Sequence, residues 1–231
     1  VAVDGKSSVG VKQIDVPKLL RGPKGSRVET RIVRHGGGEP LDFTIVRDNI
    51  PINTVDAAYK VDPKTGYIRI NRFANNTYKE FTDAVQKLGP MDALILDLRS
   101  NGGGSDGVLY PITYLAQQFL AKGNAVYALA GENTFSSALI NTVQLKDIGA
   151  AVVGTPTGGS VDHFGAVTAF ELPNSKFRGQ YSNKFIDLGS YYEAAKPYGV
   201  ESLPPDITVG QTFSDYLNGI DTAVQYILTH D

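Results

Sequence analysis

The pattern of apolar and polar residues changes partway along the chain. In the segment RVETRIVR, residues 27–34, Val28, Thr30 and Ile32 alternate with charged neighbours, and this period of two predicts a half-buried strand. A glycine-rich turn and a second strand-like segment, residues 41–47, follow, so we expect a β-hairpin. With a short helix expected at residues 16–20, these strands predict a small β-rich module over residues 1–48.

After a turn-rich stretch at residues 49–66, predicted strands alternate with predicted helices. The run ALILDL, residues 93–98, is almost entirely apolar, as expected of a strand that is covered on both faces. Such an alternation is typical of βαβ units and a mostly parallel sheet. The strands are expected at 66–70, 93–98, 125–130, 150–153, 167–172 and 180–185, and the helices at 77–88, 108–120, 136–145 and 212–228. Thr77 and Glu80 have the spacing of a capping box at the start of the first of these helices.

Composition narrows the possible classes of protein. The chain has 231 residues, which is more than one average domain and less than two. Its net charge of −2 gives no reason to expect nucleic acid or an anionic membrane as a partner, and no apolar run is long enough to span a bilayer. The absence of cysteine excludes disulfides, thiolate zinc sites and a cysteine nucleophile. The three histidines are far apart in the sequence, and we expect neither a metal nor another cofactor.

Three glycine- or serine-rich loops follow predicted strands, and each has two interpretations. The loop at 100–104 (SNGGG) has the free amides to hold an oxyanion, or is a flexible connection. Ser136 in GENTFSSA, residues 131–138, lies in the first turn of a helix, where the dipole favours a developing negative charge; otherwise Thr134 caps the helix and both serines are ordinary first-turn residues. The third loop, residues 154–165, contains His163. This residue is the one histidine suited to act as a base, or it is a loop residue with a single backbone hydrogen bond.

Taken together and in order, three stretches resemble the C-terminal processing, or tail-specific, serine proteases. They are LDLRSNGGG (96–104), NTFSSA (133–138) and VVGTPTGG (152–159). The segments at 19–25 and 28–34 resemble the second half of the PDZ module that precedes the protease core in that family. Later segments, LPNS (172–175) and PDI (205–207), fit a peptidase-like branch of the same superfamily.

This resemblance implies an α/β core of the crotonase and Clp-protease kind over residues 49–231, preceded by a partial PDZ-like module over residues 1–48. By motif position, Ser136 corresponds to the nucleophile, and the amides of Gly103 and Ser137 correspond to the oxyanion hole. The implied activity is hydrolysis of peptide bonds in a protein or peptide substrate, in an extracytoplasmic setting. The PDZ carboxylate-binding loop is expected to lie before residue 1.

One position departs from the family pattern. The general base of the family is a lysine in the loop after VVG, and this chain has Ser160 there. A hydroxyl cannot replace a neutral amine as a base, so we expect His163 to take that role, with Asp162 or Asp147 as possible orienting groups. The alternative hypothesis is a catalytically inactive relative that binds peptides or another partner.

Overall fold

The computed structural model describes residues 1–230, which form two compact units, residues 1–52 and residues from 53 onward. The first unit is a four-stranded antiparallel sheet in the order β2-β1-β3-β4 with a short helix. Its elements are β1 (Ala2–Val3), β2 (Lys6–Ser7), a 3-10 turn (Gln13–Asp15), α1 (Val16–Leu20), β3 (Arg27–Ile32) and β4 (Leu41–Val46). The hairpin and the helix predicted from sequence are therefore confirmed in this unit.

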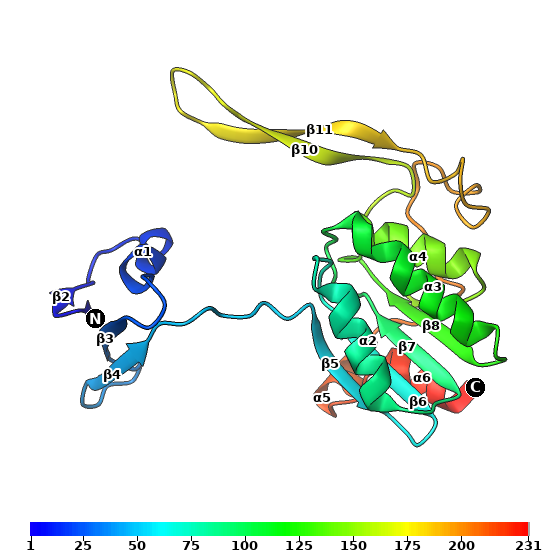
Figure 1. Ribbon diagram of the computed structural model, residues 1–231, viewed down its shortest axis with the longest axis horizontal. Coiled ribbons are helices and arrows are strands. Elements are labelled where there is room, and N and C mark those ends of the chain that lie inside the picture. Colours follow the sequence, from blue (N-terminus) through cyan, green and yellow to red (C-terminus); the bar gives the residue numbers. More distant parts are fainter. Residues whose placement is uncertain (231) are drawn as a thin grey trace. The chain divides into compact units, whose positions relative to one another are not determined.

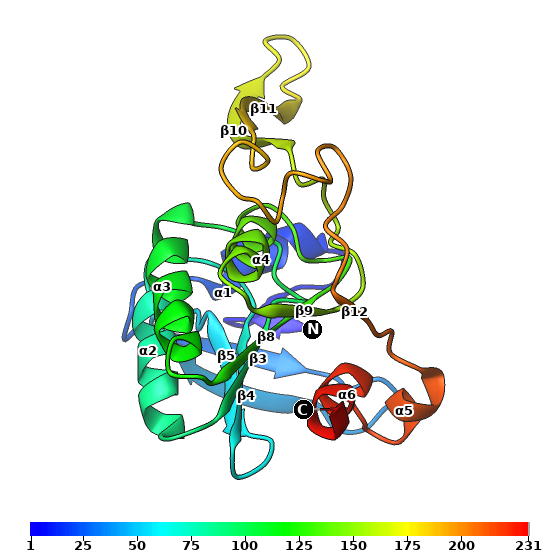
Figure 2. The ribbon, with the colours of Figure 1, turned by 90° about the vertical axis from the view of Figure 1, so that its right-hand side faces the viewer.

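The second unit is built on a six-stranded sheet in the order β12-β9-β8-β7-β6-β5. Figure 1 labels β5 to β8, and Figure 2 labels β9 and β12. All neighbouring strands are parallel except β5 and β6, which form an antiparallel pair. The strands are β5 (Val55–Lys60), β6 (Thr65–Ile70), β7 (Ala93–Asp97), β8 (Ala125–Ala130), β9 (Ala151–Gly154) and β12 (Ile207–Thr208). The α/β class and the mostly parallel sheet are as predicted, and every residue of β7 is buried.

Helices cover both faces of this sheet (Figure 2). On β7, Leu94 and Leu96 point into the larger core with α2 (Thr77–Leu88), α3 (Leu109–Leu120) and α4 (Ser137–Asp147). Ile95, which lies between them, points into a smaller core with α6 (Thr222–His230). This alternation follows from the period of two along a strand, and it explains why β7 is apolar throughout.

Three sequence-based expectations in this unit were wrong. The turn-rich stretch at 49–66 contains strand β5, which pairs with β6 across a turn in which Asp62 Oδ1 accepts from the amides of Lys64 and Thr65. The C-terminal helix is broken into α5 (Phe213–Leu217) and α6, because Gly219 adopts a positive φ between them. The capping box does not form, since the Glu80 carboxylate accepts hydrogen bonds from the amides of Thr54 and Val55 instead.

A two-stranded ribbon, β10 (His163–Glu171) and β11 (Arg178–Ile186), pairs with no other strand of the described chain. One face of it carries four exposed aromatic side chains, of Phe164, Phe170, Tyr181 and Phe185. No helix of the described residues is long and apolar enough to cross a membrane.

Candidate functional site

Ser136 has an unusual backbone conformation at the junction of β8 and α4. Its φ is +54° and its ψ is −126°, a combination that glycine adopts easily and other residues adopt at a cost in strain. It occupies the N-cap position, one residue before the first helical residue Ser137, and its side chain makes no capping hydrogen bond. The half-buried hydroxyl is therefore available for another interaction.

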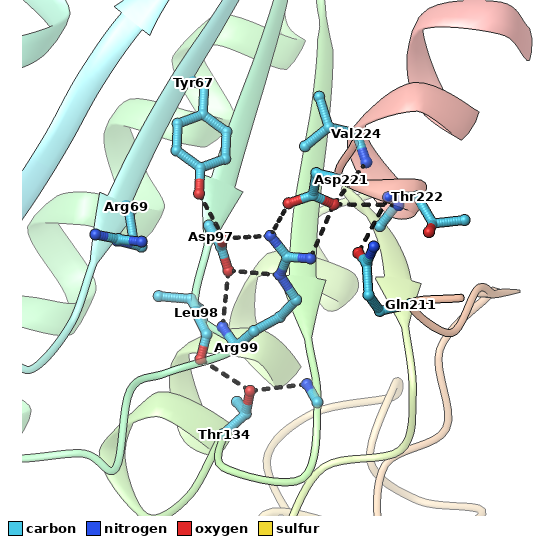
Figure 3. A network of polar contacts seen from close by, with 12 residues as sticks. Tyr67, Arg69, Asp97, Leu98, Arg99, Thr134, Gln211, Asp221, Thr222 and Val224 are labelled. Carbon is cyan, nitrogen blue, oxygen red and sulfur yellow. Dashed lines mark hydrogen bonds and ion pairs between the residues drawn. The ribbon is translucent and has the colours of Figure 1, made fainter. Parts of the chain in front are cut away.

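Thr134 does not cap α4 but joins the ends of two strands. Its hydroxyl donates to the carbonyl of Leu98 at 2.9 Å and accepts from the amide of Gly131 at 3.0 Å. Both contacts are buried, and they fix the loop that precedes Ser136 against the end of β7 (Figure 3). Of the two local interpretations of this segment, the one with Thr134 as the N-cap is wrong.

The glycine loop after β7 packs directly against Ser136. The amide of Phe135 donates to the carbonyl of Asn101 at 3.1 Å, and a β-carbon added to Gly103 would lie 2.8 Å from the Ser136 Cβ. The fully buried Asn101 side chain holds the loop from inside, donating to the Ile70 carbonyl at 3.0 Å and accepting from the Gly103 amide at 2.8 Å. The Gly103 amide, expected from the resemblance in the oxyanion hole, is thus already engaged within the loop.

Gly104 presents a different amide to the same region. Phe73 pairs with this residue as in a parallel ladder, donating to the Gly103 carbonyl and accepting from the Ser105 amide, both at 3.0 Å. Gly104 lies between Gly103 and Ser105, the two residues bonded to Phe73. In a parallel ladder the N–H and C=O of such an intermediate residue point away from the partner strand, here Phe73. The Gly104 carbonyl accepts from Ser137 Oγ at 3.0 Å, so this side of the loop faces the start of α4. The Gly104 carbonyl therefore lies on the side of the loop that faces the residue after Ser136.

The third loop, which follows β9, packs on the other flank of the Ser136 loop. The amide of Gly158 donates to the carbonyl of Thr134 at 3.1 Å, and a β-carbon on Gly159 would lie 2.7 Å from the Phe135 ring. Ser160 is half buried and forms an isolated β-bridge with Ser202. The fold therefore brings the three sequence motifs together around Ser136, with a hydroxyl at Ser160.

His163 begins β10 and lies near this cluster, with its ring centroid 6.3 Å from that of Phe135. Its Nδ1 is 3.1 Å from the carbonyl oxygen of Val161. Because a carbonyl only accepts, Nδ1 carries the proton of the neutral ring and Nε2 carries the free lone pair. Nε2 is buried and has no hydrogen-bond partner among residues 1–230.

Neither aspartate considered as an orienting group for His163 contacts its ring nitrogens. Asp162 Oδ1 accepts from the amides of Leu188 and Gly189, at 2.7 and 3.0 Å. Asp147 accepts from the amide of Ala194 at 3.0 Å. The Val161 carbonyl orients the ring instead, and a backbone contact of this kind leaves no signal in the sequence.

A partly buried polar network supports the end of β7 (Figure 3). Arg99 lies between two carboxylates: its guanidinium donates to Asp97 at 2.6 and 3.0 Å and to Asp221 at 2.6 and 3.0 Å. The hydroxyl of Tyr67 donates to Asp97 at 2.6 Å. Asp221 also accepts from the amides of Ala223 and Val224 at the start of α6. The network thus ties the C-terminal helix to the strand that leads into the glycine loop.

Charge and burial act in opposite directions on this network. Burial disfavours the charge on Asp221, but the hydrogen bonds and positive charge of Arg99 outweigh it and hold the pKa of that carboxyl below its usual value. Burial and the charge of Asp97 raise the pKa of the Tyr67 hydroxyl. Asp97 and Arg99 lie in the motif LDLRSNGGG, and no pattern in the sequence indicates that Asp221, 122 residues after Arg99, is their partner. Among residues 1–230, no group of three or more carboxylates and histidines is arranged to hold a metal ion.

The chain is similar to known proteins over part of its length. Residues 64–123 match the model of Peptidase family S41. The chain is 36% identical to the carboxy-terminal processing protease CtpA of Bacillus subtilis over 135 residues, which are 58% of this chain and 28% of that protein. It is 31% identical to the carboxyl-terminal-processing protease of Synechocystis over 146 residues, 61% of this chain and 34% of that protein. The chain thus spans about a third or less of the length of these relatives.

A solved structure shows the same fold. The tricorn protease superposes with a TM-score of 0.54 at 18% identity, over 99% of this chain and 24% of that one. At this identity the likeness supports the fold and not the activity. The matching S41 segment and the carboxy-terminal processing relatives support the resemblance seen in the three motifs. Residues 64–123 thus match peptidase family S41, and the chain is similar to carboxy-terminal processing proteases over about 60% of its length.

Proposed function

We propose that this chain carries a serine peptidase centre in which Ser136 is the nucleophile. The observation that carries the proposal is the glycine-like backbone of Ser136, at φ +54° and ψ −126°, between a strand and a helix and against the glycine loop. A strained turn of this kind displays a side chain at the end of a sheet, and such strain is typical of functional sites. The Ser136 hydroxyl, free of any capping bond, is the group displayed.

In the proposed reaction, Ser136 Oγ attacks the carbonyl carbon of a peptide bond and its proton passes to His163 Nε2. The carbonyl oxygen becomes an oxyanion, which accepts from two amides near the start of α4. The imidazolium then gives its proton to the leaving amine, and the peptide C–N bond breaks to leave an acyl-enzyme. Water, deprotonated by the same nitrogen, hydrolyses the ester and restores Ser136.

The oxyanion donors that we propose are the amides of Ser137 and Gly104. Ser137 is the first residue of α4, where an amide has no partner within the helix. Gly104 replaces Gly103 in this role because the Gly103 amide is engaged by Asn101, whereas the Gly104 carbonyl already faces Ser137. Gly103 then serves to bring the loop into contact with Ser136.

Support for His163 as the base comes from its protonation pattern. The Val161 carbonyl holds the proton on Nδ1, so that a buried lone pair on Nε2 is available to accept one. This would compensate for the hydroxyl at Ser160, where the resemblance calls for a lysine. One observation argues against His163 as the base: its Nε2 accepts no hydrogen bond from Ser136. It favours the second candidate function, a relative that binds peptides without cleaving them.

The substrate class that we propose is protein or peptide, with cleavage of the C-terminal processing type and an extracytoplasmic setting. The relatives named for that activity support it. We further propose that the first unit is part of a PDZ-like module, which its antiparallel sheet and short helix support. A PDZ module binds a peptide as an added strand at a sheet edge.

An active-site label tests the centre without knowledge of the substrate. The full chain is treated with a fluorophosphonate, which reacts with activated serines, and the modified residue is located by peptide mass spectrometry. We expect modification of Ser136, none in S136A, and a rate at least 100-fold lower in H163A. S100A, an exposed serine on the neighbouring loop, serves as the control and should react like the wild type.

The result separates the two candidate functions. Modification of Ser136 that depends on His163 supports the peptidase. A folded wild-type chain that gives no modification, or gives as much in S136A as in the wild type, overturns the nucleophile assignment and favours the peptide-binding alternative. Modification that is unchanged in H163A retains Ser136 as nucleophile and excludes His163 as the base.

A further inference from the structure

The side chain of Ser137 has no role in the proposed reaction, which uses only its amide. It is nevertheless 1% exposed, and its hydroxyl oxygen has two polar contacts outside its own helix. It donates to the Gly104 carbonyl at 3.0 Å, and it lies within a short hydrogen bond of Asp106 Oδ1. These two contacts connect the Ser137 side chain to the loop after β7, so the side chain can affect the position of that loop.

Both contacts belong to the segment that follows β7. Gly104 ends the glycine loop, and Asp106 begins the 3-10 turn Asp106–Val108 that leads into α3. The hydroxyl has one proton and both partners accept, so Ser137 shares or alternates that proton between them. In either arrangement it joins the first residue of α4 to two points on the loop.

Side-chain contacts are needed to fix this loop, because its glycines allow the backbone many conformations. Gly103 and Gly104 have φ of +102° and +141°, and residues without a β-carbon lose order easily. Asn101 and Phe73 hold the side of the loop that faces β6 and the core. On the side that faces α4, the side-chain contacts are those of Ser137.

The charge of Asp106 offers a second explanation for its place beside α4, separate from its hydrogen bond with Ser137. The first turn of this helix contains no acidic residue, yet the positive end of a helix dipole favours a nearby anion. Asp106 supplies one from another segment, through its contact with the first residue of the helix. The pair therefore joins two elements that each provide one proposed oxyanion donor.

We propose that the Ser137 hydroxyl and Asp106 are positioning residues that hold the Gly104 amide in register with the Ser137 amide. Two donors stabilise an oxyanion only when both are about 3 Å from the same point. If the loop were not held, the Gly104 amide would change position, while the Ser137 amide would stay in place because it belongs to α4. This inference rests on the proposed peptidase centre and adds to it two side chains that do not touch the substrate.

The test compares S137A, D106A and D106N in the full chain. Fluorophosphonate concentration is varied to separate the maximal rate of modification from the half-saturating concentration. Because a lost oxyanion donor typically costs 100-fold or more, we expect a misplaced one to lower the maximal rate by ~10-fold in S137A and D106A, with half-saturation within threefold. D106N keeps the acceptor oxygen without the charge and should remain within threefold of the wild type, and S100A serves as the control.

Hydrogen–deuterium exchange of residues 102–105 is a second readout that needs no activity. Exchange should be faster in S137A and D106A than in the wild type, while the midpoint of urea unfolding shows that each variant is folded. Unchanged rate and exchange in S137A would overturn the proposal, and so would a D106N variant as slow as D106A, since the charge would then be the cause. If the wild type gives no modification, the peptidase centre fails, and the exchange measurement still decides whether the tether exists.

Discussion

Gly103 lies so close to Ser136 that a β-carbon on Gly103 would stand 2.8 Å from the Ser136 Cβ and 2.9 Å from the Phe135 carbonyl oxygen. Real β-carbons do not approach a neighbour so closely. The φ of Gly103, +102°, is also one that other residues rarely adopt. Two independent requirements thus demand glycine here: the close contact with the candidate nucleophile and the positive φ of the loop.

We therefore expect G103A to be impaired in stability and in reactivity. The strained backbone and the overpacked contact together should lower the free energy of unfolding by about 2 kcal/mol or more. Fluorophosphonate modification should slow at least 10-fold because the loop moves away from Ser136. The matched control is G102A, where a β-carbon meets no atom within 4 Å and φ is not positive. Equal urea unfolding curves and equal rates for the two variants would contradict the argument.

Strain at Ser136 gives an independent prediction. Replacing Ser136 with glycine relieves a conformation that costs ~1–3 kcal/mol, while the greater freedom of glycine in the unfolded chain costs ~0.5–1 kcal/mol. S136G should therefore unfold at higher urea concentration than S136A, although both lack the nucleophile. At the exposed Ser100, where φ is not positive, the order should reverse, with S100G less stable than S100A. An S136G variant less stable than S136A would show that the turn stores no strain.

Much of the fold was predictable because burial leaves a pattern in the sequence. The apolar run of β7 predicted a strand covered on both faces, and Leu94, Ile95 and Leu96 do alternate between two cores. The meeting of the three loops also follows from topology, since parallel neighbouring strands end at the same edge of a sheet. The edge strand β5 was missed, because a run with few branched or aromatic residues flanked by turn residues resembles a turn.

The finer features of the site depend on tertiary contacts that local patterns do not encode. A Thr-x-x-Glu spacing predicts a capping box, yet Glu80 binds the amides of a strand more than 20 residues earlier. Equally, nothing in the sequence near Gly103 says that Asn101 occupies its amide, or that Asp106 reaches Ser137. The motifs predicted Ser136, Gly103 and Ser137 as site residues, whereas the hydrogen bond from the Gly103 amide to Asn101 is visible only in the structure.

The network at Arg99 predicts a large difference between two arginine–aspartate pairs. The Asp97 side chain is 4% exposed, so R99M leaves a nearly buried carboxylate without its main partner and should cost about 3 kcal/mol or more. Arg69 forms a pair with Asp56 in which both side chains are about a third or more exposed, and R69M should cost less than ~1 kcal/mol. Urea unfolding at neutral pH measures both values. Similar losses in the two variants would mean that the Arg99 network contributes no more than a surface ion pair.

The Tyr67 hydroxyl is the other donor to Asp97, at 2.6 Å, and it allows the hydrogen bond to be tested without removing a charge. Y67F keeps the ring and leaves one carboxylate oxygen with fewer donors, so we expect a loss of about 1–3 kcal/mol. Y59F is the control, because the Tyr59 ring packs against Tyr67 in a tilted arrangement, with the centroids 5.0 Å apart, and Tyr59 is about half exposed. If Y67F and Y59F unfold at the same urea concentration as the wild type, the bond to Asp97 contributes nothing to stability.

Asp221 makes the stability of the core depend on pH in a defined direction. Its folded-state pKa is depressed because Arg99 favours the charged form more than burial opposes it. A depressed carboxyl contributes stability that is fully present above its unfolded-state pKa of about 3.9 and is lost as pH falls through the folded-state value. The wild type should therefore exceed D221N in unfolding free energy by a constant amount from pH 7 to about pH 5. That difference should shrink steadily below pH 4, as the wild-type carboxyl takes up its proton.

Urea unfolding of the wild type and D221N at several pH values between 7 and 3 measures this difference. The same comparison in an R99K background is the control, because lysine cannot bind two carboxylates with a planar fork and should leave Asp221 with a smaller depression of its pKa. In the R99K background, the difference in unfolding free energy between Asp221 and Asn at this position should be smaller at neutral pH. It should also change less on acidification. A wild-type difference that is equally large at pH 3 and pH 7 would show that Asp221 acts through packing at the start of α6 and not through its charge.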